Sequence, residues 1–318
     1  MKLIIQIPCF NEEKSLQETI MNLPSDLAGF DSVEHLIIDD GSTDKTVEVA
    51  KECGVTHIFK LARNSGLAKA FSSGLEESLR LGADVIVNTD ADNQYNADDI
   101  PLLVAPILEG QADMVVGERP ISSIKHFSPI KKLLQKWGSA VVRSISRTDV
   151  RDAPSGFRAY SREAAMRLNV FSNYTYTLET IIQAGQMGMS VMSVPIRVNG
   201  ETRPSRLVKS IPSYVKRSVI TMLRVFVVYR PMRFFGYLAT LAFIPGFALA
   251  LRFLYFYLNG LGDGHIQSVI LSALLMGSGL LLGIVAVITD LISVNRRLLQ
   301  KIQWQVRKLE DELSRDDS

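Results

Sequence analysis

The sequence of 318 residues predicts an α/β domain with a mostly parallel sheet, followed by a membrane-anchoring region. Three observations lead to this prediction. Short β-rich runs alternate with helical stretches over the first two thirds of the chain, acidic residues follow several of those runs, and two long apolar segments occupy the last third. A composition of 47% hydrophobic and 21% charged residues also argues against a disordered chain.

The expected strands are short apolar runs at residues 3–7, 34–38, 56–59, 84–88, 113–116 and 190–194. Helical stretches are expected between them, at residues 12–23, 43–53, 67–81 and 130–145. In open α/β sheets, ligands bind beyond the carboxyl ends of the strands. Acidic clusters begin at Asp39 and Asp90, each within two residues of the end of an expected strand. We therefore expect the functional site at this edge of the sheet, within a domain of residues 1–208.

Charge is unevenly distributed along the chain. Residues 1–203 carry 21 Lys and Arg against 26 Asp and Glu, whereas residues 204–233 carry seven basic residues and no acidic one. Between residues 234 and 289 the only charged side chains are Arg252 and Asp263. The formal net charge of +2 therefore combines an acidic domain, a basic segment and a nearly uncharged region.

The nearly uncharged region predicts a transmembrane hairpin at residues 234–292, with helices near 234–257 and 266–290. Each apolar stretch can cross about 30 Å of hydrocarbon, the first with a short extension. Lys and Arg residues precede the first span and follow the second, so the positive-inside rule places the N-terminal domain and both termini in the cytoplasm. We therefore expect a multi-pass protein of the cell's inner membrane. The alternative is a buried helical hairpin in a soluble protein.

A basic amphipathic helix is expected at residues 209–233, between the domain and the hairpin. Apolar residues recur there at helical spacing, and most Lys and Arg residues lie off the apolar stripe. Such a helix suits the surface of an anionic membrane. A basic face can also bind nucleic acid, but two adjoining membrane spans favour the membrane, so no nucleic-acid partner is expected.

Residues 293–318 predict a cytoplasmic C-terminal helix with one apolar stripe. The stripe comprises Leu298, Ile302, Leu309 and Leu313. It is typical either of a helix that lies on a surface or of one that self-associates. A homo-oligomer is therefore among the predicted assemblies.

The acidic pair Asp90 and Asp92 is the most informative cluster, because it follows the apolar run of residues 84–88. Two carboxylates one residue apart at a strand end can hold Mg²⁺ or Mn²⁺, with diphosphate oxygens and water as further ligands. The bare tripeptide Asp-Ala-Asp is more often a solvated turn. The strand before it and two companion segments favour the metal site.

The companion segments follow the first two expected strands. They are Ile-Pro-Cys-Phe-Asn-Glu-Glu at residues 7–13 and Ile-Asp-Asp-Gly-Ser-Thr-Asp at residues 38–44. The carboxylate of Asp40 can accept a hydrogen bond from a base imide or a ribose hydroxyl, and Pro8 and Phe10 can form an apolar wall beside a base. Their acidic residues can alternatively be explained as favourable charges at helix N-termini.

With these motifs in this order, the chain resembles the family 2 glycosyltransferases, most closely the polyprenyl-phosphate glycosyltransferases related to dolichyl-phosphate mannose synthase. The resemblance covers about residues 2–210. It includes three further motifs: Asn-Ser-Gly-Leu-Ala-Lys-Ala from residue 64, Ser-Gly-Phe-Arg-Ala-Tyr from residue 155, and Arg-Pro-Ser-Arg from residue 203. The resemblance implies a GT-A fold with a binding site for a nucleotide-diphosphate sugar. It also implies that sugar transfer inverts the configuration of the anomeric carbon.

The resemblance also implies roles for individual residues. The nucleotide sugar is expected to contact Pro8, Phe10, Glu12, Ile38, Asp40, Asp90, Ala91, Arg119, Arg203 and Arg206. The metal ion, Mg²⁺ or Mn²⁺, is expected to be held by Asp92 and Gln94, with Asp90 beside it. Asp92 and Arg119 are the expected catalytic residues, because a metal ion and an arginine both stabilise charge that develops on a leaving diphosphate. Arg203 and Arg206 can alternatively belong to the basic segment that follows them.

The expected acceptor is a membrane polyprenyl phosphate that receives a hexose from a UDP- or GDP-linked donor. A phosphate with a second pKa near 6 is largely ionised at neutral pH, so it needs no general base. Lys131 and Lys132 lie near the place where the family has basic contacts to that phosphate. A hydroxyl acceptor would need a base, for which Asp152 is a better placed candidate than Glu179.

The expected role of Asp152 has an alternative, because a salt bridge to Arg151 or Arg158 would also explain it. The sequence also argues against two other functions for the whole chain. A processive polysaccharide synthase typically has a Gln-x-x-Arg-Trp motif and more membrane spans, and the sequence has neither. A non-catalytic membrane scaffold would not require the acidic pair and the arginines, all of which are present.

Overall fold

The computed structural model describes residues 1–120, 129–170, 176–199, 219–220, 223–224, 226–260 and 266–316. For residues 129–136, 311 and 314–316 only the backbone is described. The chain divides into two compact units, one formed by Met1–Ser218 with Trp304–Ser318 and the other by Val219–Gln303.

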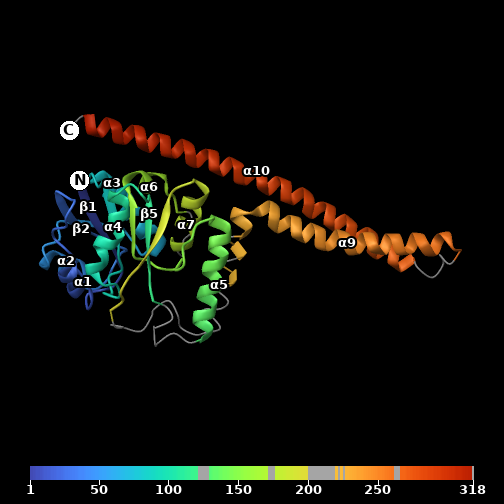
Figure 1. Ribbon diagram of the computed structural model, residues 1–318, viewed down its shortest axis with the longest axis horizontal. Helices are drawn as coiled ribbons and strands as arrows, with labels where there is room; N and C mark the ends of the chain where they lie inside the picture. Colours follow the sequence, from blue (N-terminus) through green and yellow to red (C-terminus); the bar gives the residue numbers. More distant parts are fainter. Residues whose placement is uncertain are drawn as a thin grey trace. The chain divides into compact units, whose positions relative to one another are not determined.

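The first unit contains a seven-stranded sheet in the order β3-β2-β1-β4-β6-β5-β7 (Figure 1). Neighbouring strands are parallel except at β6, which runs antiparallel to both β4 and β5. The strands are β1 (Lys2–Cys9), β2 (Ser32–Asp39), β3 (His57–Lys60), β4 (Val85–Asn88), β5 (Met114–Glu118), β6 (Arg158–Ser161) and β7 (Val191–Pro195). This is the α/β architecture that the sequence predicts.

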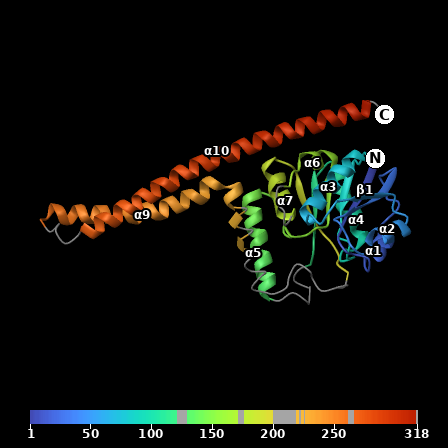
Figure 2. The same cartoon turned by 180° about the vertical axis from the view of Figure 1, so that it is seen from behind.

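Helices lie on both faces of this sheet (Figures 1 and 2). They are α1 (Leu16–Asn22), α2 (Thr46–Glu52), α3 (Leu67–Arg80), α4 (Ile100–Leu108), α5 (Pro129–Ser146), α6 (Arg162–Arg167) and α7 (Thr177–Gln186), with a 3-10 turn at Ala97–Asp99. Alternate residues of β1 point to opposite faces. Leu3, Ile5 and Ile7 join a buried cluster with residues of α1 and α4. On the other face, Phe71 of α3 stacks on Tyr176 with ring centroids 3.8 Å apart.

All six expected strands overlap strands of the structure, but β6 was not predicted. This strand has only four residues, and it begins with Arg158, whose side chain is fully buried. Its partners β4 and β5 precede it by tens of residues, so local patterning carries no signal of the pairing. The expected helix at residues 12–23 also begins later, at Leu16, because residues 12–15 form a turn in which Glu12 O accepts from Ser15 N.

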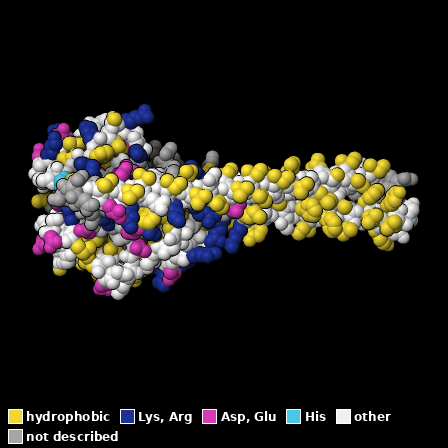
Figure 3. Space-filling model, turned by 90° about the horizontal axis from the view of Figure 1, so that it is seen from above, with side chains coloured by type: hydrophobic (Ala, Val, Ile, Leu, Met, Phe, Trp, Pro, Cys, Tyr) yellow, Lys and Arg dark blue, Asp and Glu magenta, His cyan; other side chains and the backbone are white. Residues whose placement is uncertain are grey.

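The second unit consists mainly of α9 (Pro231–Leu258) and most of α10 (Ile266–Asp316). By length and composition, Pro231–Leu258 and Ile266–Glu310 can each cross a membrane. Hydrophobic side chains cover their surface (Figure 3), and only 6% and 17% of their most apolar windows are buried. The helix α10 continues without a break past residue 290, where the second span was expected to end. Most of the helix expected at residues 209–233 lies outside the described residues.

The last turns of α10 belong to the first unit. The Arg307 guanidinium contacts the Glu76 carboxylate at 3.0 Å, and the Arg167 guanidinium lies 4.6 Å from the centre of the Trp304 ring. The C-terminal helix expected from its apolar stripe therefore contacts its own domain through α3 and α6. Leu309 and Leu313, from the apolar stripe, are exposed. Self-association of this helix remains a prediction.

Candidate active site

The candidate active site lies where the order of the strands reverses. From β1 the chain proceeds outward through β2 and β3, then returns to place β4 on the other side of β1. Such a switch point leaves a crevice at the carboxyl ends of the strands, where α/β proteins bind ligands. Phe10 follows β1, Asp40 follows β2, Asp90 follows β4 and Arg119 follows β5. The parallel direction of these strands therefore brings the four predicted site segments to one edge.

The segment after β1 presents one exposed aromatic side chain and one buried carboxylate. Phe10 is 37% exposed, whereas Glu12 is 8% exposed. The Glu12 carboxylate accepts a hydrogen bond from Ser15 Oγ at 3.1 Å, and its backbone N–H donates to Thr46 Oγ1 at 2.8 Å. Pro8 is buried inside β1. Of the residues predicted here, Phe10 is therefore the one whose side chain is open to a base.

Asp40 is buried after β2 and ties the loop that leads into α3. Its carboxylate oxygens accept from the backbone N–H groups of Ser65 and Gly66, at 2.7 and 2.9 Å. Gly66 is the residue before the first turn of α3, so Asp40 satisfies free donors near a helix N-terminus. A carboxylate has more acceptor positions than these two bonds use. The neighbouring Ile38 is fully buried in the sheet, so its side chain lies in the core.

The acidic pair lies in a compact turn after β4. Asp90, Asp92 and Gln94 are half-buried, and Asp92 Oδ1 accepts from the Gln94 backbone N–H at 3.3 Å. Ala91 is buried and its carbonyl accepts from Thr19 Oγ1 at 3.0 Å. Asn93 adopts φ of 54°, a left-handed conformation that asparagine tolerates better than most residues. The turn is therefore anchored on α1, with its carboxylates at the edge of the crevice.

The donor set of this turn fits a hard divalent cation only in part. Within the described ranges, no three His, Cys, Asp or Glu side chains gather closely enough to hold a metal ion by themselves. Asp90, Asp92 and Gln94 supply oxygen ligands, which Mg²⁺ and Mn²⁺ prefer. Mg²⁺ is commonly bound by one or two carboxylates together with substrate phosphates. These residues therefore fit an ion that is held jointly with a bound diphosphate.

Gly156 brings a second loop against Asp90. A Cβ placed on Gly156 would lie 3.0 Å from Asp90 Oδ1, so a larger residue would push the carboxylate away. The Gly156 N–H donates to the Tyr95 hydroxyl at 2.9 Å, and its carbonyl accepts from Asn88 Nδ2 at 2.8 Å. Burial, with the nearby Asp90 charge, raises the pKa of Tyr95, so this hydroxyl stays neutral. The peptide beside Asp90 is thus held from both sides.

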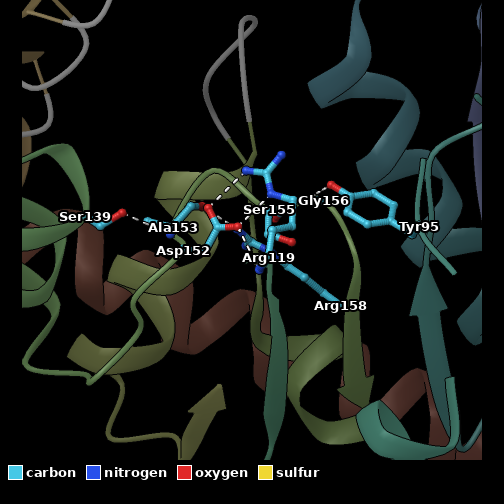
Figure 4. Close-up of polar contacts among 8 residues, drawn as sticks. All are labelled: Tyr95, Arg119, Ser139, Asp152, Ala153, Ser155, Gly156 and Arg158. Carbon is cyan, nitrogen blue, oxygen red and sulfur yellow. Dashed lines mark hydrogen bonds and ion pairs between the residues drawn. The ribbon is translucent and has the colours of Figure 1, made fainter. Parts of the chain in front are cut away.

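Arg119 is paired with Asp152 in a two-pronged ion pair (Figure 4). Nε donates to Asp152 Oδ2 at 2.6 Å and Nη2 donates to Oδ1 at 3.0 Å. Burial opposes the charge of the guanidinium, but the carboxylates of Asp152 and Asp90 raise the pKa of Arg119 overall. The sequence suggested Arg151 or Arg158 as partners of Asp152. The partner found is Arg119, because the loop before β6 passes beside the end of β5.

An open cleft of about 530 Å³ adjoins Arg119 on the side of the edge strand β7. It is lined by Glu118, Arg119, Pro120, Asp149, Arg151, Val191, Met192, Ser193, Pro195 and Ile196. Arg151 is exposed beside it. The cleft therefore offers space and a second guanidinium next to the candidate catalytic arginine.

Several predicted residues are not brought to the site by the described part of the chain. Arg203 and Arg206 lie outside the described residues, and for Lys131 and Lys132 only the backbone, in α5, is described. Glu179, the second candidate base, is buried in α7 with its carboxylate 3.4 Å from Gln183 Nε2.

Sequence reasoning also missed two residues of the site, Asn88 and Tyr95. Asn88 is a fully buried polar residue that ends an apolar strand. Its amide also donates to the Tyr176 hydroxyl at 2.9 Å. A polar residue at the end of an apolar run is the signal that could have identified it. Tyr95 has no comparable local signal, because its role comes from contact with the distant Gly156.

Comparison with known proteins agrees with this fold and site. Residues 4–168 match the family described as glycosyl transferase family 2. A UDP-N-acetylglucosamine–dolichyl-phosphate N-acetylglucosaminyltransferase of Methanococcus voltae is 30% identical over 213 residues, covering 60% of this chain and 83% of that protein. A polyprenol monophosphomannose synthase of Mycolicibacterium smegmatis is 26% identical over 204 residues, covering 61% and 76%.

A solved structure supports the fold. Glucosyl-3-phosphoglycerate synthase from Mycobacterium tuberculosis, crystallised with Mn²⁺, UDP and glucosyl-3-phosphoglycerate, superposes with a TM-score of 0.53 at 20% identity. The superposition covers 70% of this chain and 79% of that one. The sheet with its flanking helices is accordingly of the GT-A type. The chain therefore belongs to glycosyl transferase family 2 and is a glycosyltransferase.

Proposed function

We propose that this enzyme transfers a hexose from a UDP- or GDP-linked sugar to a polyprenyl phosphate at a membrane, with inversion at the anomeric carbon. The observation that carries the proposal is the position of Asp90 and Asp92 after β4 and of Arg119 after β5, at one edge of the sheet, in a chain with two helices of membrane-spanning length. The names of the two relatives, which refer to a dolichyl phosphate and a polyprenol phosphate sugar, support the acceptor class.

A divalent cation, Mg²⁺ or Mn²⁺, is proposed to bind with the donor at Asp92 and Gln94, with Asp90 beside it. When bound, the ion neutralises charge on the leaving diphosphate. The oxygen ligands of the turn after β4 fit this role, and the structural neighbour was crystallised with Mn²⁺ and UDP. Phe10 would contact the base through its exposed ring, and Asp40 would use its remaining acceptor positions on the nucleoside.

Arg119 is proposed to stabilise the negative charge that develops on the diphosphate. Its guanidinium remains ionised, and the pair with Asp152 fixes its direction before the substrate arrives. Arg203 and Arg206 are proposed to add positive charge from the segment after β7. Support comes from Asn199, whose backbone N–H donates to Gln94 O at 2.8 Å. Arg203 follows Asn199 by four residues in the sequence.

The acceptor phosphate is proposed to attack the anomeric carbon directly, on the face opposite the leaving diphosphate. One such displacement inverts the centre. The phosphate is already ionised near neutral pH, so no proton has to be removed by the protein. Lys131 and Lys132 remain proposed contacts to this phosphate, and the cleft beside Arg119 offers it a route of approach. Asp152 would act as a base only for a hydroxyl acceptor.

The membrane arrangement is part of the same proposal. The catalytic domain of residues 1–208 would lie in the cytoplasm, and the basic segment at residues 209–233 would contact anionic lipid. The hairpin at residues 234–292 would cross the inner membrane twice, which leaves both termini in the cytoplasm. Support comes from the apolar surface of α9 and α10 and from basic residues at both ends of the hairpin.

The proposal is tested with the full-length protein in lipid vesicles that contain a short polyprenyl phosphate and Mn²⁺. A panel of radiolabelled UDP- and GDP-sugars is supplied, and the lipid fraction is treated with mild acid. We expect one donor to give a labelled lipid that mild acid releases. Label found only in an acid-stable glycolipid would instead show a hydroxyl acceptor, and no transfer from any donor would favour a non-catalytic scaffold.

A matched pair of variants tests the metal site in the same assay. Asp92→Asn should lower the rate by about two orders of magnitude or more, because metal-ion stabilisation of a leaving group is worth several kcal/mol. Asp98→Asn is the control, since Asp98 is a 79% exposed carboxylate in the same region of the chain. Equal rates for both variants would contradict a metal site at Asp92.

A further inference from the structure

We propose that Arg158 is a positioning residue for sugar transfer, because it holds the loop that orients Arg119 and borders Asp90. The loop comprises residues 152–156 and is called the anchor loop below. This inference rests on the proposed function, since Arg119 and Asp90 are the groups that the loop is inferred to place. Arg158 itself is fully buried, so it acts through the loop.

The guanidinium of Arg158 makes four hydrogen bonds to residues that the structure describes, two of them to the anchor loop (Figure 4). Nε donates to Ser155 O at 2.7 Å and Nη2 donates to Ala153 O at 2.7 Å. Nη1 donates to Thr177 O at 2.8 Å and to Thr180 Oγ1 at 2.7 Å, both in the first turn of α7. One planar group therefore ties the anchor loop to a helix.

The backbone of Arg158 lies in the sheet between the two strands that lead to Asp90 and Arg119. Arg158 begins β6, and it is in register with Asn88 of β4 on one side and with Val116 of β5 on the other. Asn88 is two residues before Asp90, and Val116 is three residues before Arg119. The residue that holds the anchor loop is thus built into the sheet between the strands that carry the acidic pair and the arginine.

Both ends of the anchor loop touch the proposed catalytic groups. At its start, the Asp152 carboxylate binds the Arg119 guanidinium with two hydrogen bonds. At its end, Gly156 lies so close to Asp90 that a Cβ would be 3.0 Å from the carboxylate. Between them, Ala153 N–H donates to Ser139 Oγ of α5 at 3.3 Å. A shift of the loop would therefore move or release both Arg119 and Asp90.

The chemistry of the side chain explains why arginine is required. Burying a charge is costly unless its hydrogen bonds are satisfied, and here three carbonyls and one hydroxyl accept from the guanidinium. Only the guanidinium has a planar fork that reaches acceptors in several directions at once. Lysine keeps the charge but has a single nitrogen, so it cannot hold the loop and the helix in the same geometry.

The test compares Arg158→Lys with Arg162→Lys in the vesicle assay. Arg162 is a matched control because its guanidinium also donates to backbone carbonyls, those of Leu79 and Ala83, at the opposite end of the sheet. We expect Arg158→Lys to lower kcat about 10- to 100-fold, as misplacement by about 1 Å does. We expect the KM for the sugar nucleotide to change less than about threefold, because the loop orients Arg119 for charge that develops in the transition state.

The control variant separates positioning from stability. Arg162→Lys should keep kcat within about twofold of the parent enzyme, even where its thermal unfolding temperature falls as far as that of Arg158→Lys. If both variants lose kcat in proportion to the loss of folded protein, Arg158 has only a structural role and the inference is wrong. It is also wrong if Arg158→Lys retains the parent kcat.

A milder variant covers the case in which Arg158→Lys does not fold. Tyr95→Phe removes only the hydroxyl that accepts the Gly156 N–H and leaves the stacking of this ring on Phe157 in place. It should lower kcat about 3- to 10-fold with little change in KM, and an unchanged kcat would contradict the role of the anchor loop. If the parent enzyme transfers no sugar, the proposed function is wrong. If the parent is active and the Arg158 and Tyr95 variants are equally active, only the role of Arg158 is wrong.

Discussion

Arg119 and Asp152 form a buried ion pair in which both nitrogen–oxygen contacts are short, 2.6 Å from Nε to Oδ2 and 3.0 Å from Nη2 to Oδ1. The Arg119 backbone N–H also donates to Oδ2, at 3.2 Å. Asp152 is fully buried, and the Arg119 side chain is only 14% exposed. The carboxylate therefore fixes the direction of a guanidinium that faces the crevice.

The pair predicts a large effect of Asp152→Asn. Removing one charge of a buried pair leaves the other uncompensated, which typically costs about 3–5 kcal/mol of unfolding free energy. We expect about 3 kcal/mol here, measured by urea unfolding of the purified protein. The double variant Arg119→Met with Asp152→Asn should recover part of that stability and remain inactive. A single Asp152→Asn variant as stable as the parent would show that the pair contributes little.

The same variant separates two roles of Asp152. If the acceptor is a phosphate, Asp152 only orients Arg119, so the remaining activity of Asp152→Asn should follow pH as the parent activity does. If Asp152 removes a proton from a hydroxyl acceptor, the pH profile of the variant should differ from that of the parent, because the base has been removed. The measurement is kcat/KM from pH 5 to pH 9 for both proteins.

Asp40 predicts a joint loss of stability and donor affinity. Its carboxylate accepts from the N–H groups of Ser65 and Gly66 before α3. Asp40→Ala should therefore cost about 1–2 kcal/mol of unfolding free energy, as loss of an N-terminal cap does. It should also weaken UDP or GDP binding, measured by calorimetry. Glu52→Gln, at an exposed helical position, is the control and should change neither quantity.

His35 predicts a pH dependence of stability that is unrelated to catalysis. Burial lowers the pKa of His35 from its ordinary value of 6.5, while the bond of Nε2 to Pro24 O opposes the shift. The unfolded chain therefore binds a proton at a higher pH than the folded chain does. As pH falls below about 6.5, protonation favours the unfolded state and stability is lost. His35→Gln should flatten this slope in thermal unfolding between pH 7 and pH 5.

Two glycines of α10, Gly277 and Gly279, differ in how closely α9 approaches them, so we expect the same substitution to change stability at one and not at the other. A Cβ on Gly279 would lie 2.9 Å from Phe243 Cβ and 3.0 Å from Ala239 O of α9, whereas nothing lies within 4 Å of one on Gly277. Small residues allow membrane helices to approach closely. Overpacking typically costs about 1–3 kcal/mol of unfolding free energy. Gly279→Leu should therefore lower the unfolding temperature in detergent, and Gly277→Leu should leave it unchanged. Equal effects would contradict the α9–α10 contact.

Much of the fold could be read from local patterns. The six parallel strands are apolar runs bounded by turn residues, and the pattern is most evident in β1, β4 and β5, which are buried in the domain. The acidic turn after β4 and the aromatic residue after β1 were predicted for the same reason, since strand ends are visible in the sequence. Two uncharged segments of membrane-spanning length likewise need no partner to be recognised.

The contacts between distant segments could not be predicted in this way. Asp152 was predicted as a possible base, with a salt bridge to a near neighbour, Arg151 or Arg158, as the alternative, and in the structure it pairs with the distant Arg119. Asp40 was assigned to a nucleoside, and in the structure it first binds the loop before α3. The Arg119–Asp152 pair depends on β6, which inserts between β4 and β5 and brings the loop before it beside Arg119, and the Asp40 contact depends on the pairing of β2 with β3.

Local patterns along the chain are enough to predict the class of this protein: an α/β glycosyltransferase domain with an acidic pair at a strand end, joined to two helices apolar enough for a membrane. Hydrophobic periodicity and charge are properties of neighbouring residues, so they are visible in the sequence. The way in which the site is held follows from the folded arrangement alone: Arg119 pairs with Asp152, Gly156 lies against Asp90, and Arg158 binds the loop between Asp152 and Gly156. Those contacts depend on an antiparallel strand whose partners lie far away in the sequence.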